Sequence, residues 1–334
     1  MNTQFVIAEG ERIKRLDAFL VSHERGVSRA SLQRLILAGR IRVNEHIAKP
    51  SQKIKPGDRI AMDKPEPGPI MVNDQVVPLE LLYEDEALVV VNKPAGVVVH
   101  PTSGNWQGTL LNGLLEHFQS NKKNNGLKHL NVDPGMVHRL DKETSGVMVV
   151  AKTDQAHRGL CSQFEKHTVT RTYEALVYGA PTEHKGTIDV AIGRDMIDGK
   201  KVSTKTTKPQ TAITEFKVLQ QVGDVASHVE LTPHTGRQHQ LRVHVAGLGC
   251  PILGDQAYGG QKVCRIGEID IPRMLLHARC LGFQHPISEK WEEFFIGMPA
   301  EMEVVLEKLK LQASFSMSLK NASSSCRMSY HGRV

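Results

Sequence analysis

The chain has 334 residues, of which 40% are hydrophobic and 23% are charged, the balance of a water-soluble globular protein of two domains. It contains no apolar run long enough to span a bilayer, and its first ten residues lack the basic start and apolar core of a secretory signal. We therefore expect a cytoplasmic protein and not a membrane-spanning or exported one.

Positive charge is concentrated at the N-terminal end. The formal net charge is +6: residues 1–62 hold 12 lysines and arginines against 6 acidic residues, and the rest of the chain holds 30 of each. A compact basic module beside a neutral body is typical of a protein that binds a polyanion, most often nucleic acid. Charge alone also permits a merely well-solvated surface.

Residues 10–62 predict this module as a small α+β domain. Apolar stripes at 16–20 and 32–36 indicate two helices, and the segments 41–43 and 59–62 indicate short strands. The block resembles the S-four, or alpha-L, RNA-binding domain. Four arginines on the second helix and the following strand are expected to contact RNA, namely Arg29, Arg34, Arg40 and Arg42.

A linker and a larger body follow. Residues 63–78 contain four prolines and predict a semi-stiff tether. In the body, residues 79–311, helical and β-branched segments alternate irregularly, which predicts a mixed-sheet α+β domain. From residue 312 onward, seven of 23 residues are serine and none is acidic, which predicts a disordered tail. Predicted strands include 88–91 and 97–99, joined as a hairpin around 92–96, and 148–151, 172–177 and 229–231.

The segment VHRLDKETSG, residues 137–146, is the densest group of reactive side chains. Asp141 follows Arg139 by two residues and directly precedes Lys142. Neighbouring cations favour the ionised carboxylate, which is a poor general acid and a credible nucleophile or base. A strand is predicted directly afterwards, so Asp141 is expected on a loop that enters the strand. For an isolated aspartate, a salt bridge that fixes the loop is the alternative.

A second cluster, TPHTGRQHQLRVH at 232–244, predicts a helix. Thr235 and Gln238 have capping-box spacing, so the helix should start at Gly236. Its buried face would be formed by Leu241, Val245 and Leu248.

Arg242 lies beside this apolar face, where an arginine rarely lies without a partner. A fixed guanidinium at this position could bind Asp141 with both arms. The two clusters are therefore expected to meet at one site.

We expect neither a metal nor a nucleotide cofactor. The three histidines of the second cluster recur every five residues, which places successive side chains about 140° apart on a helix. Residues 193–201 miss a phosphate-binding P-loop by one residue between the glycines. The five cysteines are scattered without a Cys-x-x-Cys pair, which is typical of a reducing compartment.

The segment RTYEALVYG, residues 171–179, predicts a strand on which Tyr173 shares a face with Ala175 and Val177. Core packing is the ordinary interpretation. The functional interpretation is a platform on which an extruded base stacks, with a phenol able to take part in proton transfer.

Four motifs occur in the order of one family: HRLDKETSG, YEALVYG, HTGRQHQLRVH with GCPILGDQAYG, and LHARCLGFQHP. Over roughly residues 79–300 the chain resembles the RluA/RluD-type pseudouridine synthases, and VVVHPTSGN and PILGD are similar to the RluD-like branch. The resemblance implies a mixed, largely antiparallel sheet with the pseudouridine synthase fold.

The resemblance also implies a reaction, the isomerisation of uridine in RNA to pseudouridine without a cofactor. Asp141 would be the catalytic aspartate, Tyr173 would pack on the target base and Arg242 would pair with Asp141. Leu241 would be an apolar wall of the pocket, and Arg139 would contact the substrate. We expect a monomer that acts on ribosomal RNA of the large subunit or its precursor.

Two other functions remain open from the sequence. An RNA-binding factor for ribosome assembly fits the basic module equally well, although a pure binder has no need for Asp141, Tyr173 and Arg242 together. A nucleoside or glycoside hydrolase that uses Asp141 explains neither the basic module nor the lack of a clear second acid.

Overall fold

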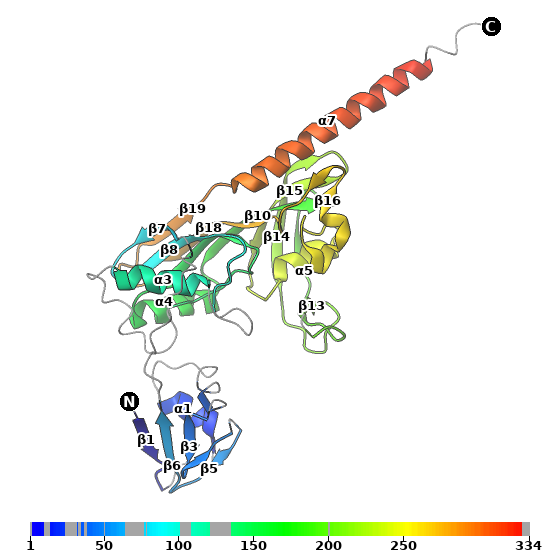
Figure 1. Cartoon of the computed structure of the whole chain (residues 1–334). Helices are drawn as coiled ribbons and strands as arrows, with labels where there is room; N and C mark the ends of the chain where they lie inside the picture. Colours follow the sequence, from blue (N-terminus) through cyan, green and yellow to red (C-terminus); the bar gives the residue numbers. More distant parts are fainter. Residues whose placement is uncertain are drawn as a thin grey trace, which may run out of the picture.

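The structure is a computed structural model of the whole chain, shown in Figure 1. It describes residues 2–9, 14–23, 32, 35–36, 39–49, 51–63, 77, 79–100, 108–120, 135–199 and 201–328. The predicted linker, 63–78, therefore lies almost entirely outside the described residues. Within the described part, no helix is long and apolar enough to cross a membrane.

The N-terminal domain is a small sheet with a helical layer. Its elements are β1 Asn2–Val6, β2 Lys14–Arg15, α1 Leu16–His23, β3 Ile41–Val43, β4 His46–Ile47, β5 Lys53–Ile54 and β6 Arg59–Asp63. The main sheet is antiparallel in the order β1-β6-β3-β4, and β2 pairs with β5. Strand β3 buries Ile41 and Val43 and leaves Arg42 exposed. The buried side chains of α1 pack into the same core as these two residues.

The domain begins one strand earlier than residue 10, where the sequence places its start. Phe5 of β1 pairs with Ile60 of β6 and meets Phe19 edge-on, with ring centroids 6.0 Å apart. A polar strand of five residues carries too little alternation to stand out in the sequence. In the predicted second helix, Leu32 and Ile36 are buried in the same core. Arg29 and Arg34 lie outside the described residues.

The second domain is built on a nine-stranded sheet. Its strands are β7 Glu80–Glu84, β8 Leu88–Lys93, β9 Ser145–Ala151, β10 Thr170–Tyr178, β11 Lys185–Asp189, β14 Ile213–Val222, β15 Ala226–Pro233, β18 Leu276–Gln284 and β19 Trp291–Phe295. The order is β11-β14-β15-β10-β18-β9-β8-β7, and β19 also pairs with β18. All neighbours are antiparallel except β9 and β18. The predicted mixed, largely antiparallel sheet is confirmed.

The parallel pair β9–β18 is short and forms a fork in the sheet. It consists of two residue pairs, His277 with Ser145 and Ala278 with Gly146. Farther along, β19 takes the same edge of β18, from Cys280 onward. The two halves of the sheet are thus joined at one narrow point.

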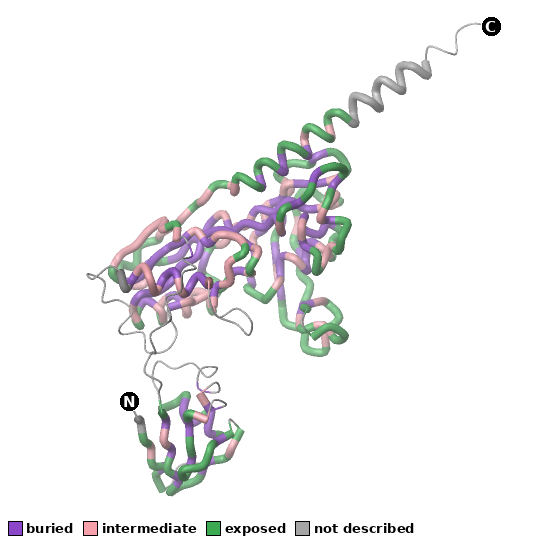
Figure 2. Tube along the Cα trace, in the orientation of Figure 1, coloured by how far each residue is buried: buried purple, intermediate pink, exposed green. Residues whose placement is uncertain are grey.

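Helices cover both faces of each half. They are α3 Leu110–Ser120, α4 Asp154–Glu165, α5 Gln240–Gly247 and α7 Ala300–Met328, with the short turns α6 Gln256–Gly259 and η2 Gln261–Val263. Helix α4 packs on one face of β8 and β9 and α3 on the other, which is why these strands read as unbroken β-branched runs. Helices α5 and α7 cover opposite faces of β10 and β15. Figure 2 shows the buried residues along these central strands.

Small two-stranded sheets complete the second domain. They are formed by β12 Gly193–Arg194 with β13 Val202–Ser203, and by β16 Arg265–Ile266 with β17 Ile269–Asp270.

The predicted hairpin around residues 92–96 is wrong, because β8 pairs with β7 and β9 and residues 97–99 form no strand. The Lys93 ammonium draws the turn inward. Its Nζ donates to two carbonyls of the turn at 2.8 Å and to the carbonyl of Lys142 at 3.1 Å. The carbonyls of Val98 and Val99 then accept from the first N–H groups of α3. This segment therefore caps a helix.

The tail predicted to be disordered from residue 312 is helical as far as Met328, because it continues α7. The first turns of α7 bury Met302, Val305 and Leu309 against the sheet. Packing of these turns supplies the helix nucleus, and elongation then needs no further periodicity. Residues 308–328 contain no glycine or proline to stop it. Residues 329–334 lie outside the described part.

Candidate active site

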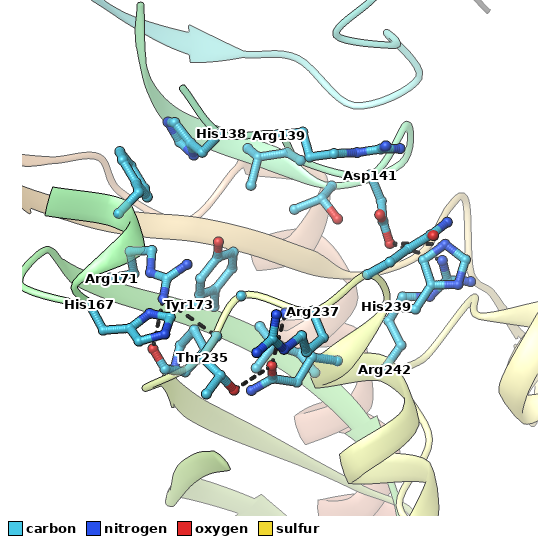
Figure 3. A pocket seen from close by; sticks show the side chains of 18 of the residues that line it. His138, Arg139, Asp141, His167, Arg171, Tyr173, Thr235, Arg237, His239 and Arg242 are labelled. Atoms are coloured by element: carbon cyan, nitrogen blue, oxygen red, sulfur yellow. Dashed lines mark hydrogen bonds and ion pairs between the residues drawn. The ribbon is translucent and has the colours of Figure 1, made fainter. Parts of the chain in front are cut away.

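A cavity of about 600 Å³ lies beside the fork in the sheet. Figure 3 shows that its walls come from the loop before β9, the start of β10, the loop after β15 and the start of α5. The sequence-predicted residues Asp141, Tyr173, Arg242, Arg139 and Leu241 all line it. The two clusters, 101 residues apart in sequence at Asp141 and Arg242, thus meet as expected.

The loop that carries Asp141 is anchored to β9. Thr144 N donates to the carbonyl of Asp141 at 3.1 Å and closes a turn. His138 Nε2 accepts the N–H of Val149 at 3.1 Å, and its ring stacks on Phe164 with centroids 4.6 Å apart. Burial lowers the pKa of His138 to about 3, with a further decrease from Arg171. The imidazole is therefore neutral, as its role as acceptor requires.

Arg242 binds two carboxylates at once. Its Nη1 donates to Asp141 Oδ2 at 3.0 Å, while Nε and Nη2 donate to the two oxygens of Asp255 at 2.7 and 2.8 Å. Burial alone would lower the pKa of Arg242, but the hydrogen bonds and charges of Asp255 and Asp141 raise it above its ordinary value. The predicted contact with Asp141 is present, but the prediction of a two-armed contact is wrong.

Asp255, and not Asp141, binds two nitrogens of the Arg242 guanidinium because its carboxylate is held in a suitable position. Its side chain is only 1% exposed, and Oδ1 also accepts the N–H groups of Ala257 and Tyr258 at the start of α6. These hydrogen bonds from the start of the helix fix the carboxylate independently of its contact with Arg242. The sequence contains this residue in the motif GDQAYG, but nothing in the spacing connects it to Arg242.

His239 and Tyr258 complete the surroundings of Asp141 and were not predicted. His239 Nε2 lies 3.7 Å from Asp141 Oδ2, and its Nδ1 lies 2.8 Å from the Tyr258 hydroxyl. That hydroxyl oxygen also accepts the N–H of Val202 at 3.2 Å, which fixes Tyr258 beside His239. Burial lowers the pKa of His239, although the charge of Asp141 opposes this. The His239 ring therefore lies between Asp141 and Tyr258.

Helix α5 begins at Gln240, four residues after the predicted start at Gly236. Gln240 Oε1 lies 2.7 Å from Thr235 Oγ1 and accepts the N–H of Arg237 at 3.1 Å, so Gln240 takes the part predicted for Gln238. His239, at the N-terminal boundary, has a positive φ of 55°. Residues 236–239, which the prediction placed in the helix, form a loop that lines the cavity. Of the predicted buried face, Leu241 and Val245 are buried, but Leu248 is 40% exposed at the last turn.

Tyr173 lies on β10 with its ring between two core clusters. It shares a face with Ala175 and Val177, as the alternation predicts. Burial raises the pKa of the phenol; Arg171 opposes this shift and Asp141 adds to it. The hydroxyl is therefore protonated near neutral pH.

In the N-terminal domain, two of the arginines predicted to contact RNA, Arg40 and Arg42, lie within the described residues. Arg40 pairs with Asp63 at 2.8 Å, with both side chains about half exposed. Arg42 is exposed on β3. Within the described part of the chain, no three His, Cys, Asp or Glu side chains are grouped so that they could hold a metal ion.

Comparisons with known proteins agree with this geometry. Residues 87–247 match the family described as RNA pseudouridylate synthase, and residues 14–60 match the S4 domain. The chain is 41% identical over 303 residues to the uncharacterized RNA pseudouridine synthase YlyB of Bacillus subtilis, covering 91% of this chain and 96% of that protein. It is 39% identical over 303 residues to the ribosomal large subunit pseudouridine synthase D of Zymomonas mobilis, covering 89% and 94%.

Among solved structures, the human RNA pseudouridylate synthase domain containing 4 protein is similar, with a TM-score of 0.56 and 28% identity. The match covers 69% of this chain and 93% of that one. Sequence, fold and the cavity therefore lead to one conclusion: the chain belongs to the RluA/RluD-type RNA pseudouridine synthases, enzymes that isomerise uridine in RNA.

Proposed function

We propose that this enzyme forms pseudouridine in large-subunit ribosomal RNA and that Asp141 is its catalytic residue. The observation that carries the proposal is the Asp141 carboxylate, which lies in a cavity lined by four arginines with one oxygen held by Arg242. The Zymomonas relative is named for the large ribosomal subunit, which supports this choice of RNA.

The geometry suits an extruded uridine. Removing a base from its stack costs a few kcal/mol, and stacking on Tyr173 returns roughly 1–3 kcal/mol. Asp141 Oδ1 has no hydrogen-bond partner among the described residues, so it is free to act on the nucleotide as a nucleophile or a base while Arg242 holds Oδ2. The N-glycosidic bond breaks, uracil turns within the cavity, C5 bonds to the sugar and the C5 proton leaves.

Release of tritium from uridine C5 tests the proposal, because forming the new bond must expel that hydrogen. Large-subunit RNA transcribed with tritium at uridine C5 should lose label to wild-type enzyme, and Asp141→Asn should reduce the rate by about 10³-fold or more. Asp224→Asn is a matched control, since Asp224 is exposed in the turn between β14 and β15 and does not line the cavity. It should retain the wild-type rate.

Two results would contradict the proposal. Equal rates for wild type and Asp141→Asn would remove Asp141 from the chemistry. Release from transfer RNA together with none from large-subunit transcripts or precursor subunits would replace the proposed substrate.

A further inference from the structure

Arg171 carries a positive charge that no acid neutralises within the described residues. It lies on β10 two residues before Tyr173, and both side chains line the cavity. Its Nε is buried and has no hydrogen-bond acceptor in the described part of the chain. Partly buried arginines are ordinarily paired with an anion. This side chain is therefore arranged for an anion that the described protein does not supply.

The guanidinium is oriented by its surroundings. Nη2 donates to the carbonyls of Pro233 at 3.3 Å and of Thr235 at 3.4 Å, and Cζ lies 5.9 Å from the centroid of the Phe164 ring. Nη1 faces Gly236, where a Cβ atom would lie only 3.0 Å away. Glycine at this position leaves space around Nη1. One edge of the guanidinium is thus fixed, and other donors remain unused.

His167 also lines this end of the cavity, whereas Arg237 lines it beyond Tyr173, on the side of Arg242. Figure 3 shows His167 close to Arg171, with Tyr173 between this end and the end that holds Asp141. Glu165 is the acid at this end, and it is exposed. Over the whole cavity wall, four arginines outnumber the two acids, Asp141 and Glu165, so the lining carries a net positive charge.

These observations identify the class of ligand. A uridine that stacks on Tyr173 with its sugar at Asp141 remains attached to its strand, so phosphate groups must continue along the cavity wall. A guanidinium donates to phosphate oxygens in a fixed geometry, and such contacts set the position of a nucleic acid without reading its sequence. We propose that Arg171 binds a phosphodiester group next to the target uridine. The proposal rests on RNA being the substrate of this cavity.

The test compares Arg171→Gln with Arg158→Gln in the full-length enzyme. Arg158 is exposed on α4 and does not line the cavity. Binding of a large-subunit RNA transcript is measured at several salt concentrations. Loss of one phosphate contact should reduce the slope of log Kd against log salt by about 0.7–0.9 in Arg171→Gln, and Arg158→Gln should keep the wild-type slope. Arg171→Lys retains the charge and should also keep it.

A small probe locates the contact in the cavity. Wild-type enzyme should bind the trinucleotide UpUpU about tenfold or more tightly than its uncharged methylphosphonate analogue, because charged hydrogen bonds contribute strongly. Arg171→Gln should lose most of this preference, and Arg158→Gln should keep it. An Arg171→Gln enzyme with the wild-type slope and preference would overturn the proposal. A slope of log Kd against log salt that is reduced as much in Arg171→Lys as in Arg171→Gln would also overturn it. The role of Arg171 would then be structural.

The binding measurements need no turnover, so the two proposals can fail separately. Absence of tritium release from every RNA would refute the proposed function, while UpUpU binding would still decide whether Arg171 holds a phosphate. Normal tritium release with an unchanged charge preference would refute only the phosphate site.

Discussion

Arg242 illustrates how one side chain is fixed by one carboxylate and serves another. Asp255 holds two nitrogens of the guanidinium, and the remaining Nη1 meets Asp141. The ring of Tyr258 packs 4.9 Å from Cζ on a further side. The orientation of the donor is therefore set before any substrate binds, which is how preorganised sites lower the cost of reaching the transition state.

Replacement of this arginine should separate binding from chemistry. Arg242→Lys keeps a positive charge but cannot bond to Asp255 and Asp141 together, because an ammonium is a point charge without the planar fork. We expect RNA affinity within about twofold of wild type and a single-turnover rate reduced by about 10²-fold or more. Asp255→Asn should show the same pattern more weakly. Near wild-type single-turnover rates in Arg242→Lys would show that the planar guanidinium of Arg242 is not needed for the reaction.

At the scale of an element, the loop before β9 depends on a neutral histidine. Strand β9 leaves β18 after Gly146, so the N–H of Val149 has no partner strand on that side and donates to His138 instead. Protonation of His138 would remove this acceptor and place a charge in a partly buried site. The loop that carries Asp141 is thus coupled to the protonation state of one side chain.

This coupling predicts acid sensitivity. The pKa of His138 is about 3 in the folded protein and 6.5 ordinarily, so the unfolded chain binds more protons between these values. The contribution of His138 to the free energy of unfolding is therefore complete above about pH 6.5. It decreases toward pH 3, by up to about 1.4 kcal/mol per pH unit. Denaturant unfolding of His138→Gln should show a shallower dependence on pH. His184→Gln, at an exposed turn residue, should keep the wild-type dependence.

The elements differ in how far the sequence predicts them. The segments 88–91 and 148–151 are identifiable because both of their faces are buried, which selects β-branched residues throughout. Residues 97–99 have the same composition but cap α3, and composition does not distinguish these roles. The start of α5 was misplaced because Gln238 and Gln240 are both possible partners for Thr235, and only tertiary contacts select Gln240.

The site was predicted as far as its motifs extend. Asp141, Tyr173 and Arg242 stand in distinctive segments, and the cavity brings them together. Asp255 and His239 were missed because their importance depends on which carboxylate and which imidazole lie within reach of Arg242 and Asp141. Such distances follow from the packing of α5 on the sheet and not from spacing in the sequence.

At the scale of the whole molecule, charge and chemistry reside in different domains. The N-terminal core cluster contains only residues from the first 62, so the domain with the net charge of +6 has its own core. The cavity with Asp141 draws its residues from the second domain alone. Long-range attraction to RNA is thus separable from the reaction.

Deletion of residues 1–62 should weaken capture of RNA and spare catalysis. We expect a higher apparent KM, a nearly unchanged single-turnover rate at saturating RNA and a flatter slope of log Kd against log salt, because fewer counterions are released. Arg40 should contribute less than Arg42 to the lost slope, since Asp63 already neutralises part of its charge. A truncated enzyme with the full slope would mean that the basic domain does not hold the RNA.

The fork between β9 and β18 has a kinetic consequence. The cavity beside it has a volume of about 600 Å³ among the described residues of the free protein, so space for an extruded base is present there before RNA binds. The energetic barrier to entry then lies in the RNA, where each uridine must leave its own stack. Uridines in loops, bulges or mismatches leave most cheaply and should react first. The order in which sites are modified would thus be set by the local melting of the RNA.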